Sequence, residues 1–329
     1  MRPTVDAPRL AVALGPDVPS GEFPVAIHSV FRAALNVVRP GGDLLSLLSN
    51  EACDGPQSIR LASVEDFSSC SLVAGAAGAF AAAEITLDRS GGLPPFRVDC
   101  ASARRLAAEP LPQIGAAEER WSAGVALLDA LQERAGTDLR IRCLLTDAAA
   151  PGPLGERLAR TALALGRSVR AGDVEAAQHA AARLVGLGTG LTPTGDDFLC
   201  GFHAAALCRD GARPGESRLL AALAHAVRER LGATTALSAT LLRSALAGHV
   251  FGPLAALAEA CAGKPGCGAP AAVLRLASVG HSSGMDAATG FFYGLTIWRN
   301  STDLAARAAP ASDPTISVAH RSGLAAAGG

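Results

Sequence analysis

Two different periods of hydrophobic residues divide the chain. From about residue 8 to residue 100, short apolar runs alternate with turns rich in Gly and Pro, whereas after about residue 116 apolar residues recur every three or four positions. The first pattern is typical of short strands and the second of amphipathic helices. The sequence therefore predicts an α+β fold, with a β-rich domain over residues 1–110 that could be a small barrel, and a mostly α-helical domain over residues 111–302. Residues 303–329 are rich in Ala, Ser, Pro and Gly and are expected to be disordered.

The individual elements follow from the same patterns. Strands are expected at residues 9–14, 43–49, 58–63, 71–76, 81–88 and 96–100, with one helix at residues 28–38 between them. Helices are expected at residues 116–136, 153–172, 173–188, 196–211, 216–232, 234–249, 253–263, 271–280 and 285–300. Asp173 is a predicted N-cap, and Gly186 and Gly188 are predicted helix terminators. Asn36 stands in an apolar run, so its side chain needs a polar partner; on a helix it would share a face with His28, Ser29 and Arg32.

One polar sequence motif occurs twice in the helical half. Residues 184–202 read LVGLGTGLTPTGDDFLCGF, and residues 276–294 read LASVGHSSGMDAATGFFYG. The two stretches share one skeleton, formed by Gly195, Asp197, Gly201 and Phe202 in the first and by Gly284, Asp286, Gly290 and Phe291 in the second. Each copy is a loop of Gly, Ser and Thr that carries an acid into an apolar helix. The sequence therefore predicts two pseudo-repeated loop–helix units.

Small residues continue along both of these helices. Ala205 follows Gly201 by four positions, and Gly294 follows Gly290 by four. A Gly inside an exposed helix costs about 1 kcal/mol relative to Ala, so a compensating contact is expected. We expect the two helices to meet at these small faces and to bring both loops and both Asp residues to one pseudo-symmetric cleft.

The loops have the chemistry of an anion site. Each leads into a helix N-terminus, where free amide groups and the helix dipole favour a phosphate or carboxylate. The candidate binding residues are Gly188, Gly190, Thr192, Thr194, Gly195 and Asp196 in the first loop, Ser282, Ser283 and Gly284 in the second, and Thr234 and Ser238 on a nearby polar helix. Alternatively, the first loop is a tight turn with Asp196 or Asp197 as helix cap, and Thr234 and Ser238 bond back to their own backbone.

His281, Asp197 and Asp286 are the candidate catalytic residues. His281 could act as a general acid or as an anion donor, or it could be only a polar loop residue. Two acids beside an anion would repel it, so Asp197 and Asp286 could share a Mg²⁺ or K⁺, or could orient loop amides without a metal. Arg243 and His249, further along the polar helix, are weaker candidates for the same cleft.

Composition narrows the possible partners. The 29 Lys and Arg residues balance 30 Asp and Glu residues, which argues against nucleic acid or an anionic membrane surface as a partner. The chain has no apolar run of about eighteen residues, and its first residues lack the apolar core of a signal peptide, so a cytoplasmic protein is expected. The 8 cysteines are scattered without a CxxC pair and are expected to be buried small hydrophobes, with no zinc site.

Several segments resemble a bacterial domain-of-unknown-function family, number 2877. They are HSVFRAALNV, GPQSIRL, GLGTGLTPTGDDFLCG, TTALSATLL and GHSSGMDAATGFFYG, spread over about residues 25–300, and GLTPTGDD is the most specific of them. The family is related to a subunit of oxamate carbamoyltransferase in anaerobic allantoin degradation, where it occurs beside FdrA-type partner subunits. That reaction interconverts oxalurate plus phosphate with oxamate plus carbamoyl phosphate.

The resemblance implies a transferase subunit that binds phosphate, carbamoyl phosphate or a small carboxylate, and that assembles with partners or as an oligomer. The alternative is a ligand-binding or assembly subunit without activity of its own. The Ser-Thr-Arg-Thr segment that ordinary carbamoyltransferases use does not occur in this sequence, which argues against a complete enzyme of that type.

Overall fold

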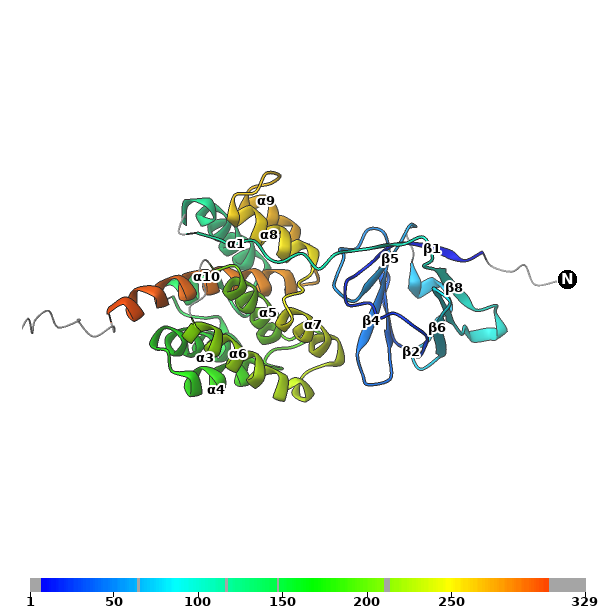
Figure 1. Ribbon diagram of the computed structural model, residues 1–329, viewed down its shortest axis with the longest axis horizontal. Coiled ribbons are helices and arrows are strands. Elements are labelled where there is room, and N and C mark those ends of the chain that lie inside the picture. Colours follow the sequence, from blue (N-terminus) through cyan, green and yellow to red (C-terminus); the bar gives the residue numbers. More distant parts are fainter. Residues whose placement is uncertain (1–6, 64–65, 116–117, 147, 210–213, 308–329) are drawn as a thin grey trace, which may run out of the picture.

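The computed structural model describes residues 7–63, 66–115, 118–146, 148–209 and 214–307. Strands occupy the N-terminal part and helices the remainder, so the predicted α+β class is confirmed (Figure 1). Of the C-terminal segment expected to be disordered, residues 303–307 belong to the last helix and residues 308–329 lie outside the described part of the chain. How the chain divides into independently folding domains stays a prediction.

The N-terminal strands close into an eight-stranded barrel, as the sequence suggested. The strands are β1 (Arg9–Leu14), β2 (Phe23–Val30), β3 (Ala34–Val38), β4 (Leu44–Leu48), β5 (Ser58–Leu61), β6 (Ala77–Ala81), β7 (Glu84–Leu87), β8 (Phe96–Asp99) and the short β9 (Arg104–Arg105). Their order is β5-β4-β3-β2-β6-β7-β8-β1-β9, and β1 closes the ring by pairing antiparallel with β5. Alternate apolar side chains, such as Leu35, Val37, Ile85 and Val98, fill the interior.

The helix predicted for residues 28–38 is wrong. Residues 28–30 end β2, and residues 34–38 form β3, which pairs antiparallel with β2. Apolar residues at 35 and 37 point into the barrel, so the period there is two rather than 3.6. The expected partner of Asn36 does exist: its amide donates to Ser29 Oγ at 3.0 Å and its carbonyl oxygen accepts from Ser46 Oγ at 2.7 Å. The strand expected at residues 71–76 is also wrong, since the next strand begins only at Ala77.

Ten α-helices make up the rest of the described chain. They are α1 (Ser122–Ala135), α2 (Ile141–Leu145), α3 (Gly152–Ala171), α4 (Val174–Leu184), α5 (Thr194–Leu207), α6 (Pro214–Glu229), α7 (Ala236–Leu246), α8 (Gly252–Ala262), α9 (Ala269–Ala277) and α10 (Ser283–Arg307). Asp173 caps α4 as predicted, because its carboxylate accepts from the amide of Ala176 at 3.0 Å. Helix α4 ends at Leu184, just before Gly186, which has a φ of 72°.

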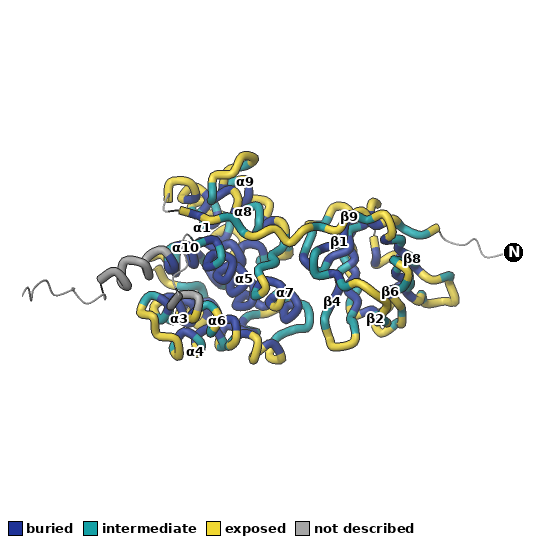
Figure 2. Tube along the Cα trace, viewed as in Figure 1, coloured by how far each residue is buried: buried dark blue, intermediate teal, exposed yellow. Residues whose placement is uncertain are grey.

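Helices α5 and α10 form the centre of this half, and α5 is buried over nearly all of its length (Figure 2). Their glycines meet the other helix reciprocally. A Cβ on Gly201 would lie 1.9 Å from the carbonyl oxygen of Ala287, and a Cβ on Gly290 would lie 2.0 Å from that of Phe198. Further along, Gly294 faces Ala205. The small faces therefore meet as predicted, with the two helices running in the same direction and their N-termini side by side.

The barrel contacts the helical half mainly through α7 and the segment after it. Asp17, which follows β1, accepts hydrogen bonds from Ser244 Oγ and from His249 Nδ1. Nearby, the amide of Leu44 donates to Thr240 Oγ1 at 3.2 Å, and Arg243 forms an ion pair with Asp43 at 2.6 Å. Polar contacts thus fix α7 and the segment after it against the loop that follows β1 and against the start of β4.

The reciprocal glycine contact should control stability. We expect Gly201→Ala and Gly290→Ala each to lower the free energy of unfolding by about 1–3 kcal/mol, because the new methyl group would overlap a backbone carbonyl that cannot move alone. Denaturant unfolding measures this. Gly232→Ala is the matched control, since its Cβ would meet nothing within 4 Å. Equal stability of Gly201→Ala and Gly232→Ala would contradict the close packing.

Candidate functional site

The two sequence repeats fold into equivalent helix–loop–helix units, one made of α4 and α5 and the other of α9 and α10. In the first, the amide of Gly195 donates to the carbonyl of Leu187 at 2.7 Å; in the second, the amide of Gly284 donates to that of Val279 at 3.1 Å. Both glycines also touch the end of the preceding helix: a Cβ would lie 2.1 Å from Leu184 O in one case and 1.7 Å from Leu276 O in the other. The predicted pseudo-repeat is therefore a structural repeat.

The two loops contact one another at the paired N-termini of α5 and α10. Thr192 Oγ1 and Ser283 Oγ share a hydrogen bond between the loops. Gly188 supports the first loop, because its φ is 134° and a Cβ there would lie 2.5 Å from the amide nitrogen of Thr194. The sequence-predicted residues Gly188, Thr192, Thr194, Ser282 and Ser283 are thus brought together. Gly190 lies at the exposed outer part of the first loop.

Asp196 faces α7 and holds it against α5. Its Oδ1 accepts from the amide of Gly186 at 2.8 Å, and its Oδ2 accepts from Ser238 Oγ at 2.7 Å and from the Thr234 hydroxyl. Burial raises the pKa of Asp196, and these hydrogen bonds oppose the rise. Thr234 and Ser238 therefore donate to a carboxylate of the chain itself. The sequence predicts either that they bind a ligand or that they bond back to their own backbone, and the structure shows this third arrangement instead. The hydrogen bonds make Asp196 a positioning group.

Asp197 and Asp286 occupy equivalent positions in the first turns of α5 and α10. Both side chains are buried, with relative exposures of 5% and 1%. Asp197 Oδ2 and both carboxylate oxygens of Asp286 are buried and receive no hydrogen bond of good geometry, although loop hydroxyls lie close to both acids. The hydrogen bond between Thr192 and Ser283 joins the loops that carry the two acids, and Asp286 raises the pKa of Asp197 by like-charge repulsion.

Burial is the main cause of unusual pKa values in this pair. It raises the pKa of Asp197 well above its ordinary value, with Asp286 adding to the rise and the Ser283 and Thr192 hydroxyls opposing it. Burial also raises the pKa of Asp286 to about 7, against the opposing effect of the Ser282 and Thr194 hydroxyls. Each acid is thus influenced by one hydroxyl of its own loop and one of the other loop. Such perturbed, adjacent acids are typical of functional sites, although buried structural pairs show them too.

The third candidate catalytic residue lies nearer the surface. His281 is exposed in the loop before α10, and the adjacent Ser282 and Ser283 are half-buried. Solvent therefore reaches the imidazole and the loop hydroxyls more easily than the two carboxylates below them.

Arg243 and His249 belong elsewhere. Arg243 pairs with Asp43 and His249 with Asp17, so both hold the barrel against α7 and do not join the two loops. The sequence does not reveal Asp17 and Asp43 as the partners of these residues, because the contacts join distant parts of the chain. Arg243 and Asp43, for example, are 200 positions apart.

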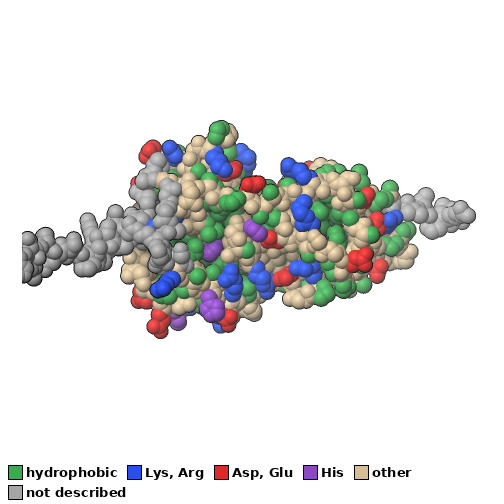
Figure 3. All heavy atoms as spheres, in the orientation of Figure 1, with side chains coloured by type: hydrophobic (Ala, Val, Ile, Leu, Met, Phe, Trp, Pro, Cys, Tyr) green, Lys and Arg blue, Asp and Glu red, His purple; other side chains and the backbone are tan. Residues whose placement is uncertain are grey.

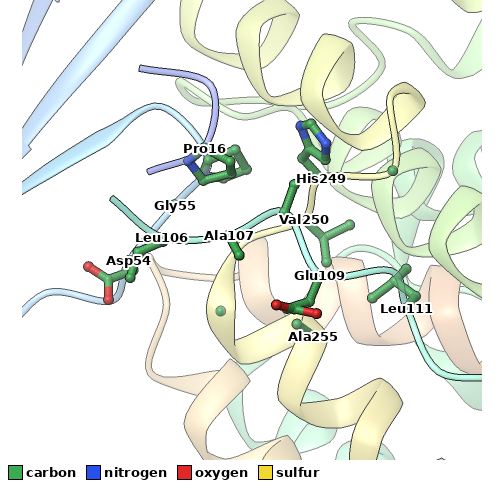
Figure 4. Close-up of a pocket in the computed structure, with 14 residues that line it drawn as sticks. Pro16, Asp54, Gly55, Leu106, Ala107, Glu109, Leu111, His249, Val250 and Ala255 are labelled. Carbon is green, nitrogen blue, oxygen red and sulfur yellow. The ribbon is translucent and has the colours of Figure 1, made fainter. Parts of the chain in front are cut away.

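A hollow of about 180 Å³ lies beside this contact. Figure 4 shows the segment through Leu106, Ala107 and Glu109 passing between Asp54 of the barrel and His249 of the helical half. Pro16, Val250 and Ala255 complete much of its largely apolar wall. No motif in the sequence marks this hollow, because its lining comes from four separate connecting segments and from the start of α8.

Metal-binding clusters of the usual composition do not occur in the described part of the chain, where no group of three or more His, Cys, Asp or Glu side chains could hold an ion. The acid pair and the loop hydroxyls offer oxygen atoms only. Most cysteines are buried as expected, but Cys53 is exposed and Cys267 is half-buried.

Comparison with known families agrees with this architecture. Residues 8–105 match the AllH family N-terminal domain, and residues 184–295 match the family model described as oxamate carbamoyltransferase subunit AllH. The chain belongs to the AllH family. The first match covers the barrel, and the second covers α5 to the middle of α10 with both loops. Searches of curated proteins and of solved structures found no significant match.

Two surface properties complete the description. None of the described helices is long and apolar enough to cross a membrane. On the face shown in Figure 3, basic and acidic side chains are interspersed over both halves, in line with the formal net charge of −1.

The raised pKa of Asp286 predicts how stability depends on pH. The folded protein holds this proton up to about pH 7, whereas an unfolded Asp releases it near pH 3.8, so folding stability falls as pH rises through that window. Asp286→Asn removes the titrating group, and we expect its unfolding free energy to fall less steeply, by up to about 1.4 kcal/mol per pH unit. Urea unfolding between pH 4 and pH 7.5 in metal-free buffer measures the slope. Asp88→Asn, at an exposed position, should keep the wild-type slope, and an unchanged slope in Asp286→Asn would contradict the assignment.

Proposed function

We propose that this chain is a subunit of a carbamoyltransferase of the oxamate carbamoyltransferase type, and that it holds the anionic ligand at the paired N-termini of α5 and α10. The observation that carries the proposal is the parallel arrangement of these two helices. Their first turns lie side by side, so the partial positive charges of both N-termini point to one place. Phosphate, carbamoyl phosphate, oxamate and oxalurate all present the negative oxygens that such a place favours.

The loop side chains supply the remaining contacts. The Thr192, Ser282 and Ser283 hydroxyls are half-buried at the entrance of the helix pair. Ser282 can donate a hydrogen bond to a ligand oxygen, and so can whichever of Thr192 and Ser283 accepts in the hydrogen bond that these two share. Donors that are fixed before the reaction begins stabilise charge that develops in the transition state. We assign to the exposed His281 the role of giving a proton to, or taking one from, the nitrogen of the transferred carbamoyl group or of its acceptor.

The burial of Asp197 and Asp286 solves a difficulty of this arrangement. Ionised carboxylates below an anion would repel it, but burial favours their neutral forms. A protonated acid carries no charge and can donate a hydrogen bond. We infer that the two acids support the loops from beneath, while the hydroxyls and helix amides contact the ligand.

A second candidate function rests on the sparse set of reactive groups at the loops. In the described part of the chain, the two acids are buried and the exposed titratable group of these loops is His281. This favours a subunit that binds the ligand or organises the assembly while a partner subunit completes the active site. FdrA-type proteins are the partners that the family relationship suggests.

Ligand-dependent melting tests the proposed anion site. A ligand present at a hundredfold excess over its dissociation constant should stabilise the fold by about 2.7 kcal/mol. We expect carbamoyl phosphate or oxamate to raise the melting temperature of the wild-type chain, and the rise to disappear in the double variant His281→Ala, Ser282→Ala. Ser69→Ala, at an exposed position in the barrel half, should retain the full rise.

Activity separates the two candidate functions. The isolated chain and its complex with partner subunits are assayed for oxamate-dependent consumption of carbamoyl phosphate. Turnover by the complex that His281→Ala reduces by about 10²-fold or more would support a catalytic role at this site. Ligand binding with full activity of the His281→Ala complex would support the binding-subunit alternative. Unchanged melting with every ligand, for the chain and for the complex, would contradict both.

A further inference from the structure

The unsatisfied oxygens of Asp197 and Asp286 require an explanation. Buried carboxylates in proteins normally accept several hydrogen bonds, and leaving one without partners is costly. Here three of the four carboxylate oxygens of the pair receive no hydrogen bond of good geometry, although both side chains are at least nine-tenths buried and loop hydroxyls lie close to each of them. Asp196, directly adjacent, accepts three hydrogen bonds, so it differs in this respect from Asp197 and Asp286.

Other oxygen atoms surround the pair with the same pseudo-symmetry. Asp197 has the Thr192 and Ser283 hydroxyls as neighbours, and Asp286 has the Thr194 and Ser282 hydroxyls. The hydrogen bond between Thr192 and Ser283 fixes the two loops at this separation. Both halves of the repeat thus contribute one carboxylate and two hydroxyls to the same place.

Such a donor set matches a hard cation. Carboxylate and hydroxyl oxygens are ligands of Mg²⁺ and Ca²⁺, and Mg²⁺ in particular is often held by one or two carboxylates together with a substrate phosphate. The charge of the pair favours a divalent over a monovalent cation, because two ionised carboxylates carry two negative charges. A divalent ion neutralises both, whereas K⁺ would leave one buried negative charge uncompensated.

We propose that Asp197 and Asp286 together bind one divalent, oxygen-seeking cation at the paired N-termini of α5 and α10, with the loop hydroxyls as further ligands. If the proposed function holds, the ion also bridges the acids to the anionic ligand, so repulsion becomes attraction. The proton and the cation are then alternative occupants of the same pair, and binding the metal releases the proton. Asp138 near Asp286, and Asp196 and Cys200 near Asp197, are the other titratable neighbours; the two acids among them add negative potential when ionised.

Equilibrium dialysis of the full chain against Mg²⁺, Ca²⁺ and K⁺ separately, at pH 8 and without any anionic ligand, tests the proposal. We expect one Mg²⁺ or Ca²⁺ per chain and a rise in melting temperature with that ion. Asp197→Asn and Asp286→Asn should each weaken binding at least about tenfold. Asp88→Asn should bind as the wild type does.

Folding of each variant is checked by circular dichroism. Ser282→Ala, which keeps both carboxylates, provides a milder test in which binding should weaken without loss of the fold. No divalent ion bound at millimolar concentration, binding of K⁺ alone, or full binding by both Asn variants would each overturn the proposal.

A second titration separates this inference from the proposed function. Carbamoyl phosphate is added to metal-free and to Mg²⁺-loaded protein. Stabilisation that is equal in the two samples would overturn the cation proposal and leave the anion site in place. A bound divalent ion with no response to any anion would uphold the cation site and contradict the proposed function.

Discussion

The close contact between α5 and α10 is the constraint on which the rest of the helical half depends. Gly201 of α5 lies against the carbonyl of Ala287 in α10, and Gly290 of α10 lies against the carbonyl of Phe198 in α5. The two contacts are equivalent in the two repeats. The contact sets the two helices parallel, so their N-termini coincide at one end. This parallel alignment of the two helices brings the two loops into contact and places the two acids in equivalent first turns.

Parallel neighbouring helices carry an electrostatic cost, because like ends of two dipoles face each other. Acidic residues in the first turn are the usual compensation, and here both helices carry one facing the partner. Their burial, however, makes full ionisation costly without a counter-charge. In the two proposals, a proton, a cation and an anionic ligand compete for or share this site, and we assign it carbamoyl or phosphate chemistry rather than a packing role alone.

The sequence reveals this unit well because the constraint acts on local residues. A glycine, an acid and a second glycine recur at fixed spacing in both copies. The first glycine lies against the end of the preceding helix, and the second lies against the backbone of the other central helix. The barrel is harder to predict. The segment with Asn36 has apolar residues compatible with either period, and only its pairing with β2 and β4 decides that it is a strand.

Contacts distant in sequence were the least accessible to prediction. Arg243 and His249 are ordinary polar residues on a helix until the barrel places Asp43 and Asp17 opposite them. The carboxylate of Asp196 likewise determines what Thr234 and Ser238 do, across about 40 residues of chain, as the separations of 38 and 42 show. Residue types at these positions indicate polarity, and only the tertiary fold assigns the partner.

The central claim is that Asp197 and Asp286 act as one unit. A double-mutant cycle on the free energy of unfolding, with Asp197→Asn, Asp286→Asn and the double variant in metal-free buffer at pH 8, measures their coupling directly. The account predicts a coupling energy of at least about 1 kcal/mol, because removing either charge relieves the other. Additivity within about 0.5 kcal/mol would show that the two acids are independent, and would contradict a shared site.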